Sequence, residues 1–337
     1  MELLKLLLLI LIAILSNIHT MKSSELLVHE YYKEKCPLAE EIVRHNMEVA
    51  IFKDPRLAAS LLRLHFHDCF VMGCDASVLL DSVEGMTSEK QAGPNLNSLR
   101  GFEVIDKIKY LLEEECPLTV SCADILAMAA RDAVELRGGL RWEVWLGRKD
   151  SLESSFSGAG LFIPAPNSSL QTLINNFKQQ GLDIEDLVVL SGSHTIGRAR
   201  CVSFRQRIYE TKQEYHYSYG YDYDRYKRYT TFRRILGSIC PVKGRDNKFA
   251  PLDFQTPKRF DNHYFINILE GKGLLGSDNV LISQDMDGKI REQVWGYASN
   301  EKLFFASFAK SMIKMGNINV LTGNAGEIRR NCRFVNT

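Results

Sequence analysis

Residues 61–81, LLRLHFHDCFVMGCDASVLLD, bring together two histidines, one arginine, two cysteines and three aspartates in one short segment. Apolar residues recur around them at helical spacing, so we expect a helix that begins near Asp54. On that helix Arg63 and His67 are four residues apart and share one face. A permanent cation beside a group that can accept a proton is suited to the heterolytic splitting of a small polar bond. His65 points away from this face, and we interpret it as a core or surface residue.

The second half of the segment offers a different chemistry. Asp68, Asp75 and Ser77 supply side-chain oxygens, with a glycine and the Cys69 and Cys74 pair close by. A tight loop of oxygen donors is typical of a site for a hard cation, and calcium is the extracellular candidate. We therefore expect a calcium site directly after the histidine.

The N-terminus predicts export from the cell. Lys5 precedes ten apolar residues, 6–15, followed by small and polar ones. This run is too short to span a bilayer but fits a secretory signal peptide. We place that peptide at residues 1–24, with cleavage between His19 and Ser24, and the alternative is a buried N-terminal helix. No other stretch is long and apolar enough to predict a membrane span.

Net charge and length limit the partners and the number of domains that the rest of the chain can have. Cleavage after Ser24 would remove two of the 42 basic and one of the 41 acidic residues and leave 40 of each. A neutral chain argues against nucleic acid as a partner, because duplex binding needs a basic surface. At 337 residues the chain is long enough for one large domain or two moderate ones with a substantial core, and we assign residues 25–337 to one domain.

Cysteine usage agrees with export. An even number of cysteines behind a signal peptide suggests four disulfides formed in an oxidising compartment. The spacing leaves the pairing open, and the absence of any CxxC motif argues against a zinc ribbon. The eight cysteines are Cys36, Cys69, Cys74, Cys116, Cys122, Cys201, Cys240 and Cys332.

The periodicity beyond this segment is mostly helical. An amphipathic pattern over residues 104–112 stops at Cys116, before a proline. Ser121 resembles the start of a capping box for a helix that is apolar on nearly every side and therefore central and buried. Residues 183–190 predict another helix, which Gly192 follows. The chain is thus predicted to be mainly α, with no repeats and no linker.

One segment is unusual in composition. Residues 209–229 contain eight of the thirteen tyrosines, and residues 198–234 contain ten basic residues against four acidic ones. We favour a solvated surface excursion between helices. The alternative is a patch that attracts a polyanion such as an acidic cell-wall polysaccharide.

Together these residues resemble the class III haem peroxidases, the secreted plant peroxidases. The opening segment is similar to the distal-haem signature of that family. Further similar motifs follow in order along almost all of residues 25–337: YYKEKCP, RGFEVIDKIK, VSCADILAMAARDAV, WLGRKDS, IPAPN, DLVVLSGSHTIGRARC, PLDFQTPKRFDNHYF, GLLGSDNVL and NCRFVN.

The resemblance implies a mainly α, two-lobed fold with haem b between a distal and a proximal half. It places Arg63 and His67 on the distal side, where they would split hydrogen peroxide, and Phe66 against the haem. Asn95 and Glu89 match the residues behind them, and a hydrogen bond from His67 to Asn95 would keep the imidazole oriented and neutral.

On the proximal side His194 matches the ligand of the haem iron. Asp278 matches the carboxylate that accepts the other ring N–H of that histidine and makes it a stronger electron donor to iron. Pro164 matches a proline that contacts the electron donor at the exposed haem edge. The only N-x-S/T sequon, at Asn167, follows closely and would carry a glycan near that entrance.

The resemblance also implies two calcium ions and a set of disulfides. The distal ion would bind Asp68, Val71, Gly73, Asp75 and Ser77, with carbonyls from Val71 and Gly73. The proximal ion would bind Thr195, Asp253, Thr256, the Arg259 carbonyl and Asp261. The disulfides would be Cys36–Cys116, Cys69–Cys74, Cys122–Cys332 and Cys201–Cys240.

The implied activity is that of a haem-dependent peroxidase. It would reduce hydrogen peroxide to water while oxidising small phenolic donors in one-electron steps, in the metabolism of lignin and wall phenolics or the response to oxidative stress. The alternatives are a secreted, calcium- and disulfide-stabilised binding protein without catalysis, and a metal hydrolase, for which HExxH is absent. We expect a monomer in the cell wall or apoplast, with the vacuole as the alternative.

Overall fold

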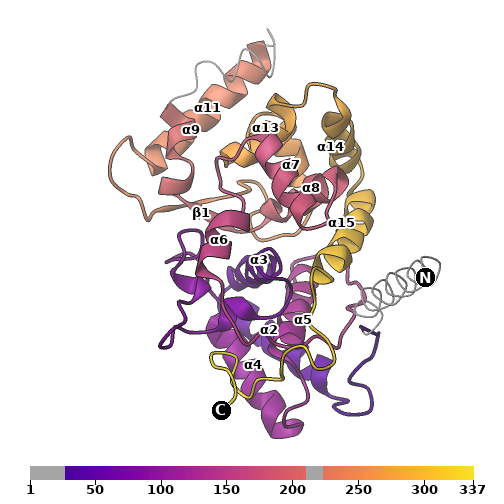
Figure 1. Cartoon of the computed structure of the whole chain (residues 1–337). Helices are drawn as coiled ribbons and strands as arrows, with labels where there is room; N and C mark the ends of the chain where they lie inside the picture. The colour runs from indigo at the N-terminus through magenta and orange to yellow at the C-terminus, as the bar shows by residue number, and fades with distance from the viewer. Residues whose placement is uncertain (1–26, 210–222) are drawn as a thin grey trace, which may run out of the picture.

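The computed structural model describes residues 27–209 and 223–337. The chain forms two helical lobes stacked one above the other, joined along one side by helix α15 (Figure 1). The predicted signal peptide, residues 1–24, and most of the tyrosine-rich segment lie outside the described residues. The prediction of a mainly α fold is confirmed.

The lower lobe is formed largely by the N-terminal part of the chain. Its helices are α2 (Ala39–Lys53), α3 (Leu57–Cys69), α4 (Phe102–Glu115) and α5 (Cys122–Glu135), with the 3-10 helices η2 (Ser77–Leu79) and η3 (Glu89–Gln91) and the short helix α6 (Phe156–Phe162).

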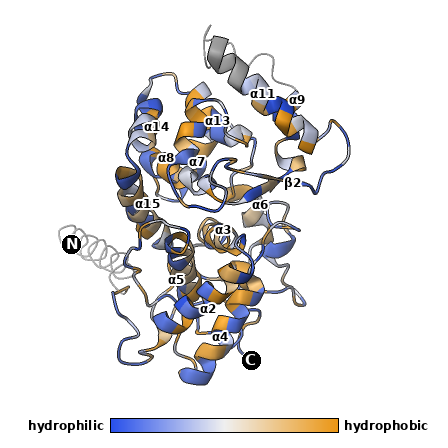
Figure 2. Ribbon diagram, turned by 180° about the vertical axis from the view of Figure 1, so that it is seen from behind, coloured by the Kyte–Doolittle hydropathy of each residue, from blue (hydrophilic) through white to orange (hydrophobic). Residues whose placement is uncertain are grey.

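Helix α5 is the centre of this lobe. Every residue of α5 except Glu135 is buried, as the all-round apolar pattern predicts (Figure 2). The Ser121 side chain accepts a hydrogen bond from the backbone N–H of Asp124, at 3.1 Å, and so caps the first turn. Helices α2, α3 and α4 pack against α5, which fixes the position of the histidine-bearing helix α3.

Helix α3 begins later than the periodicity suggests. The Asp54 side chain accepts a hydrogen bond from the backbone N–H of Arg56, and its carbonyl accepts one from Leu57. These bonds form a turn that separates α2 from α3, so the regular helix starts at Leu57.

The upper lobe contains most of the C-terminal half. Its elements are α7 (Leu170–Gln179), α8 (Ile184–Ser191), η4 (Gly192–Thr195), β1 (Arg198–Arg200), η5 (Cys201–Ser203), α9 (Arg205–Tyr209), α11 (Tyr223–Ile239), β2 (Phe249–Pro251), α12 (His263–Leu269), α13 (Gly276–Ser283), α14 (Lys289–Ser299) and α15 (Glu301–Gly316). Strands β1 and β2 pair antiparallel. In the part of the chain that the structure describes, no helix is both long and apolar enough to cross a membrane.

Helix α8 has the predicted start and end. The Asp183 side chain accepts the N–H of Asp186, and the Asp186 side chain accepts the N–H of Asp183, so the two form a capping box. The helix ends at Ser191, and η4 continues directly from it. This continuation carries His194 to the boundary between the lobes.

Three disulfides connect distant parts of the chain, and the fourth, Cys69–Cys74, closes a short loop directly after α3. The four pairs are Cys36–Cys116, Cys69–Cys74, Cys122–Cys332 and Cys201–Cys240. These are the pairs that the resemblance implies. After α15, residues 321–337 return along the lower lobe; we call them the C-terminal strap (Figure 1).

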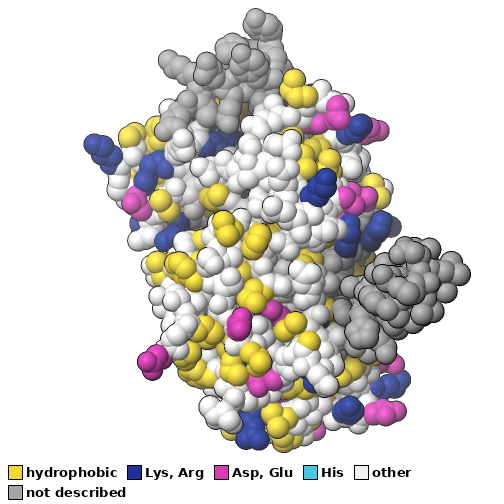
Figure 3. Space-filling model, viewed as in Figure 1, with side chains coloured by type: hydrophobic (Ala, Val, Ile, Leu, Met, Phe, Trp, Pro, Cys, Tyr) yellow, Lys and Arg dark blue, Asp and Glu magenta, His cyan; other side chains and the backbone are white. Residues whose placement is uncertain are grey.

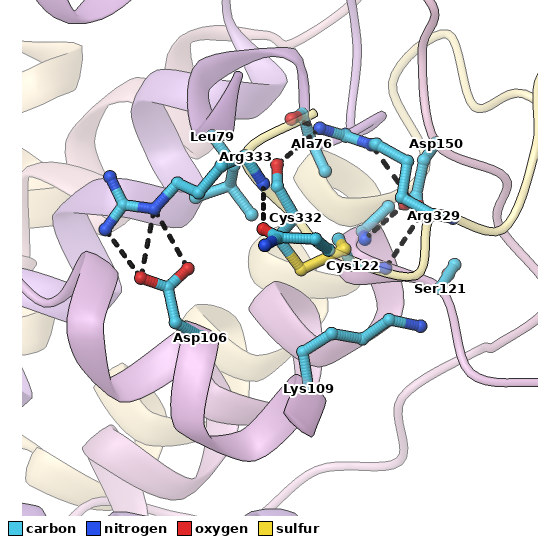
Figure 4. The surroundings of a disulfide bond; sticks show 12 residues. Ala76, Leu79, Asp106, Lys109, Ser121, Cys122, Asp150, Arg329, Cys332 and Arg333 are labelled. Atoms are coloured by element: carbon cyan, nitrogen blue, oxygen red, sulfur yellow. Dashed lines mark hydrogen bonds and ion pairs between the residues drawn. A yellow bond between two sulfur atoms is a disulfide. The ribbon is translucent and has the colours of Figure 1, made fainter. Parts of the chain in front are cut away.

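The strap is fixed by buried polar contacts beside the Cys122–Cys332 disulfide (Figure 4). Arg329 is fully buried, and its guanidinium donates hydrogen bonds to the carbonyls of Cys332 and Ala76. Its backbone N–H donates to the Asp150 carboxylate, which also accepts the N–H groups of the first residues of α5. The strap is thereby bonded both to α5 and to the loop after α3.

Candidate active site

A cavity of about 600 Å³ lies between the two lobes. That volume is within the range of ligand and cofactor sites. Its walls include Phe66, Leu187, Leu190, Ile196 and Met312, so most of the interior is apolar. Both His67 and His194 line it. The fold therefore places both histidines that the sequence analysis assigned to the haem, His67 and His194, in the wall of one cavity.

His67 is buried in the wall that α3 forms and is oriented by an amide. Its Nδ1 lies 2.6 Å from Asn95 Oδ1, and Asn95 Nδ2 in turn donates to the carbonyl of Glu89, at 2.8 Å. Because Asn95 presents its oxygen to the ring, Nδ1 carries the proton and Nε2 keeps its lone pair. Burial, and then the charge of Arg63, lower the pKa of His67 well below its usual value.

Arg63 lies one helical turn before His67 and also lines the cavity. One of its terminal nitrogens, Nη2, donates to the carbonyl of Pro94 and the hydroxyl of Ser98, at 2.9 and 3.2 Å. Burial, and then the charge of Arg200, lower the pKa of Arg63 to about 10, so it is a cation at neutral pH. The loop that orients His67 thus also holds the guanidinium.

His65 is buried like His67 but does not line the cavity. It is buried on another face of α3, and its ring nitrogen lies 3.6 Å from the Cys69 sulfur. Burial, and then the charge of Arg148, lower the pKa of His65 to about 3. It is a neutral core residue, as expected.

His194 occupies the opposite wall. Its Nδ1 lies 2.7 Å from Asp278 Oδ1, and the other oxygen of that carboxylate accepts the backbone N–H of Leu275. The hydroxyl of Tyr264 donates to the same carboxylate at 3.3 Å. The bond to Asp278 uses one ring nitrogen of His194 and leaves Nε2 as the nitrogen that can bind a metal.

Glu89 lies behind the distal wall, among residues that could hold a cation. Its side chain accepts the N–H of Ser155, while its other oxygen, and the hydroxyl of Ser77, are buried without a hydrogen-bond partner among the described residues. Burial raises the pKa of Glu89 to about 7. Asp68, near the end of α3, and Asp75, in the loop that follows, are both buried, and burial, followed by the charge of Asp75, raises the pKa of Asp68. A divalent cation bound to these oxygens would remove this unfavourable burial of charge, so the residues present fit calcium.

A second group of oxygens adjoins His194. The Thr195 hydroxyl donates to Asp261 at 2.9 Å, and the Thr256 hydroxyl donates to Asp253 at 3.1 Å. Asp261 Oδ2 is buried and accepts no hydrogen bond among the described residues. These predicted ligands lie close together, and an oxygen without a donor again fits a hard cation.

Sequence reasoning missed one neighbour of this second group. His263 Nδ1 lies 3.3 Å from Asp261 Oδ2, and the ligand atoms of Asp253, Asp261 and His263 lie within 4.8 Å of one another. The only signal in the sequence was that His263 is two residues from Asp261, which places Asp261 in the turn before α12 and His263 at the first residue of that helix.

The exposed lining residues mark the mouth of the cavity. Pro164 is half-buried there, next to exposed Ala165. Four arginines that sequence reasoning did not assign to the site also line the cavity: Arg56, Arg100, Arg198 and Arg200.

Comparison with known proteins identifies the family. The family model described as "Peroxidase" matches residues 43–300. The chain is 68% identical to "Peroxidase 20" of Arabidopsis thaliana over 312 residues, which cover 93% of this chain and 92% of that protein. The chain belongs to the class III plant peroxidases. It is also 54% identical to "Peroxidase 9" and to "Peroxidase 72" of the same plant, over 91% of this chain and 86% and 89% of theirs.

The peroxidase is therefore an enzyme that reduces hydrogen peroxide and oxidises a donor, and the predictions of family, function and enzyme class are confirmed. The family typically uses haem and calcium. The four disulfides are consistent with the secretory pathway.

Proposed function

We propose that this peroxidase holds haem b in the cavity between its lobes, with His194 as the iron ligand. The observation that carries this proposal is the pair of oriented histidines on opposite walls of one apolar cavity, each with one ring nitrogen bonded to a protein oxygen. When bound, the haem supplies an iron that passes electrons from the donor to peroxide. Phe66 would pack against it and Asp278 would strengthen electron donation by His194.

His67 and Arg63 would carry out the proton and charge steps. His67 accepts a proton from hydrogen peroxide at Nε2 and returns it to the oxygen that leaves as water. Arg63 donates hydrogen bonds to that oxygen while negative charge builds on it. Over a full cycle, one hydrogen peroxide and two phenols give two waters and two phenoxyl radicals, so atoms and electrons balance.

Small phenols would enter at the mouth near Pro164 and transfer one electron each. In the plant this chemistry serves lignin and wall phenolics or the response to oxidative stress. Asn167 is exposed beside this entrance, which supports glycosylation there.

Two calcium ions would support the two histidines. The distal ion binds Asp68, Val71, Gly73, Asp75 and Ser77, and the proximal ion binds Thr195, Asp253, Thr256, Arg259 and Asp261. Each group of ligands begins at the residue directly after a cavity-lining histidine, so each ion would fix the position of one catalytic segment.

The mature enzyme would consist of residues 25–337, secreted as a monomer into the cell wall or apoplast. An acidic wall polysaccharide is its proposed macromolecular partner. The composition around the tyrosine-rich segment supports this: residues 198–209 and 223–250 contain twelve basic residues and two acidic ones, Asp224 and Asp246, in a chain of net charge +1.

The test is to refold the full chain with hemin and calcium. We expect a Soret band that shifts when peroxide is added, and steady turnover of a phenol. His194→Ala should lose both pigment and turnover, whereas His45→Ala, an exposed position on α2, should keep them. Colourless wild-type protein, or pigment and turnover unchanged in His194→Ala, would contradict the proposal.

A further inference from the structure

Two glycines lie on the same side of the cavity mouth. Gly93 and Gly160 both line the cavity, and both are exposed. They come from different segments, but the residues that precede them, Ala92 and Ala159, are buried in one small apolar cluster. The packing of the two alanines against that cluster therefore brings the two glycines together.

Neither the backbone nor the packing requires glycine at these two positions. Both glycines have φ outside the left-handed region, and a Cβ atom added at either would have nothing within 4 Å among the described residues. Gly160 lies inside α6, where glycine stabilises a helix less than alanine does. The fold would thus accept side chains at both positions, and glycine leaves the mouth wide there.

Helix α6 exposes an apolar surface next to this opening. Its segment FSGAGLF contains no charged residue. Gly158 and Ala159 are buried, whereas Phe156 is 45% and Leu161 70% exposed. On the face in Figure 3, hydrophobic side chains lie near the middle of the molecule, where Figure 1 draws α6. We call the exposed side formed by Phe156, Gly160 and Leu161 the outer face of α6.

The outer face of α6 is continuous with the cavity. Gly160 belongs to both, and Pro164, two residues after the helix ends, also lines the cavity. Phe156 precedes Gly160 by four residues, so the two lie on one side of the helix, about 6 Å apart along its axis. That distance is comparable with the spacing of two aromatic rings joined by a two-atom bridge. A molecule of this length can reach from the mouth onto the face.

The chemistry of the face fits a neutral aromatic group. Exposed apolar surface beside a binding site is typical of a place where an apolar group binds. A phenol bound at the mouth would place a second ring over Phe156 and Leu161, where the two aromatic rings can pack edge to face.

We propose that the outer face of α6 binds the second ring of an extended electron donor. This peroxidase would therefore prefer neutral phenols that carry a further aromatic ring, such as linked phenol dimers, over single-ring phenols. The inference rests on the proposed function, which places the donor at this mouth, and it names the donor class of that same site.

The first experiment measures binding without turnover. The haem-loaded enzyme is titrated, without peroxide, with 4-benzyloxyphenol and with 4-methoxyphenol, and binding is followed by difference spectroscopy of the Soret band. Both compounds are 4-alkoxyphenols, and they differ by one added ring. We expect 4-benzyloxyphenol to bind roughly fivefold more tightly, which corresponds to burying about 40 Å² of that ring. Equal affinities in the wild type would overturn the inference.

Leu161→Asn tests whether this preference depends on α6. The substitution removes apolar surface from the outer face and should reduce the preference to roughly twofold or less. Leu303→Asn is the matched control, because Leu303 is an exposed leucine on α15 outside the cavity lining, and it should preserve the preference. An equal reduction in both variants would overturn the inference.

The second experiment measures selectivity in turnover, as the ratio of kcat/KM for 4-benzyloxyphenol to that for 4-methoxyphenol. Gly160→Leu fills the space between the outer face and the cavity and should lower this ratio roughly fivefold. Ser157→Leu adds the same side chain at an exposed position of α6 outside the cavity lining and should not lower it. Leu161→Asn should act mainly through a higher KM for 4-benzyloxyphenol, because it removes binding remote from the reacting ring. An equal fall in Gly160→Leu and Ser157→Leu would overturn the inference.

Gel filtration tests a different occupant of the face, a second copy of the chain. We expect the wild type to elute as a monomer. A dimer that Leu161→Asn dissociates would overturn the inference, because the outer face of α6 would then be an interface between copies. A Soret band with turnover of 4-methoxyphenol shows that the proposed function stands in either case, whereas their absence shows that it fails.

Discussion

At the scale of single residues, the two cavity histidines differ by the group that holds each ring. The amide oxygen of Asn95 accepts a bond from His67 without adding charge, so the ring can take up and release a proton. The carboxylate of Asp278 adds negative charge to His194 and favours a permanent bond to a metal. The two environments therefore suit the roles proposed for these histidines, a base for His67 and a metal ligand for His194.

Asn95→Val tests the first of these arrangements. Valine is shorter and apolar, and it offers no acceptor to His67 and no donor to the Glu89 carbonyl, so the ring loses its fixed tautomer. We expect the rate constant for reaction with peroxide, measured by stopped flow at the Soret band, to fall roughly 10–100-fold. Asn175→Val, an exposed asparagine on α7, should react at the wild-type rate. A normal rate in Asn95→Val would mean that the amide does not orient the base.

At the scale of elements, the position of His194 depends on how closely three helices approach. A Cβ atom added at Gly192 would lie 2.6 Å from Phe304 and 2.8 Å from Phe265, so only glycine fits between α8, α12 and α15. Gly192→Ala should therefore push η4 away and destabilise the protein by about 1–3 kcal/mol.

The same substitution should also weaken haem binding, because His194 follows two residues later. Denaturant unfolding and transfer of haem to apomyoglobin measure the two effects. Gly160→Ala, in α6, is the matched control because an added Cβ there has nothing within 4 Å. If both variants behaved alike, close packing at Gly192 would not be what positions the ligand.

The C-terminal strap makes a second prediction at this scale. Arg329→Met removes the donors to the carbonyls of Ala76 and Cys332 in a fully buried position. We expect a loss of about 3 kcal/mol or more in the free energy of unfolding, since buried acceptors would be left unpaired. Because Ala76 lies between Asp75 and Ser77, the variant should also lose bound calcium faster, as measured by metal analysis after gel filtration.

Arg330→Met is the control for the strap. Arg330 is the next residue and is exposed, so its substitution should change the free energy of unfolding by no more than about 0.5 kcal/mol. Equal effects of the two substitutions would show that the buried contacts of Arg329 do not hold the strap.

At the scale of the whole molecule, the sequence predicted features that depend on local spacing and on family motifs. Helix type, the capping of α5 at Ser121, the helix near residues 183–190, and the pair of His67 and Arg63 on one face all follow from residues a few positions apart. The start of α3 was less well predicted, because turn bonds of Asp54 compete with the helix.

Contacts between distant segments could not be predicted in the same way. Arg56 lines the same cavity as Arg198 and Arg200, which lie more than 140 positions later in the chain, and Arg329 reaches the carbonyl of Ala76 across 253 positions. Neither contact leaves a periodic pattern in the sequence. Their positions follow only from the packing of the lobes, which composition and spacing do not specify.

The disulfide that closes the longest loop provides a test of this long-range order. Cys122 and Cys332 are 210 positions apart, whereas Cys201 and Cys240 are 39 apart. If each disulfide acts by limiting the conformational entropy of the unfolded chain, the longer loop contributes about 5.4 kcal/mol to the free energy of unfolding. The shorter loop contributes about 3.9 kcal/mol. Replacing both cysteines of a pair by serine should therefore destabilise the protein by about 1.5 kcal/mol more for Cys122–Cys332, measured by reversible denaturant unfolding. The strap contacts beside that bond can only enlarge the difference, so a smaller loss than for Cys201–Cys240 would contradict an entropic role for this connection between α5 and the C-terminal strap.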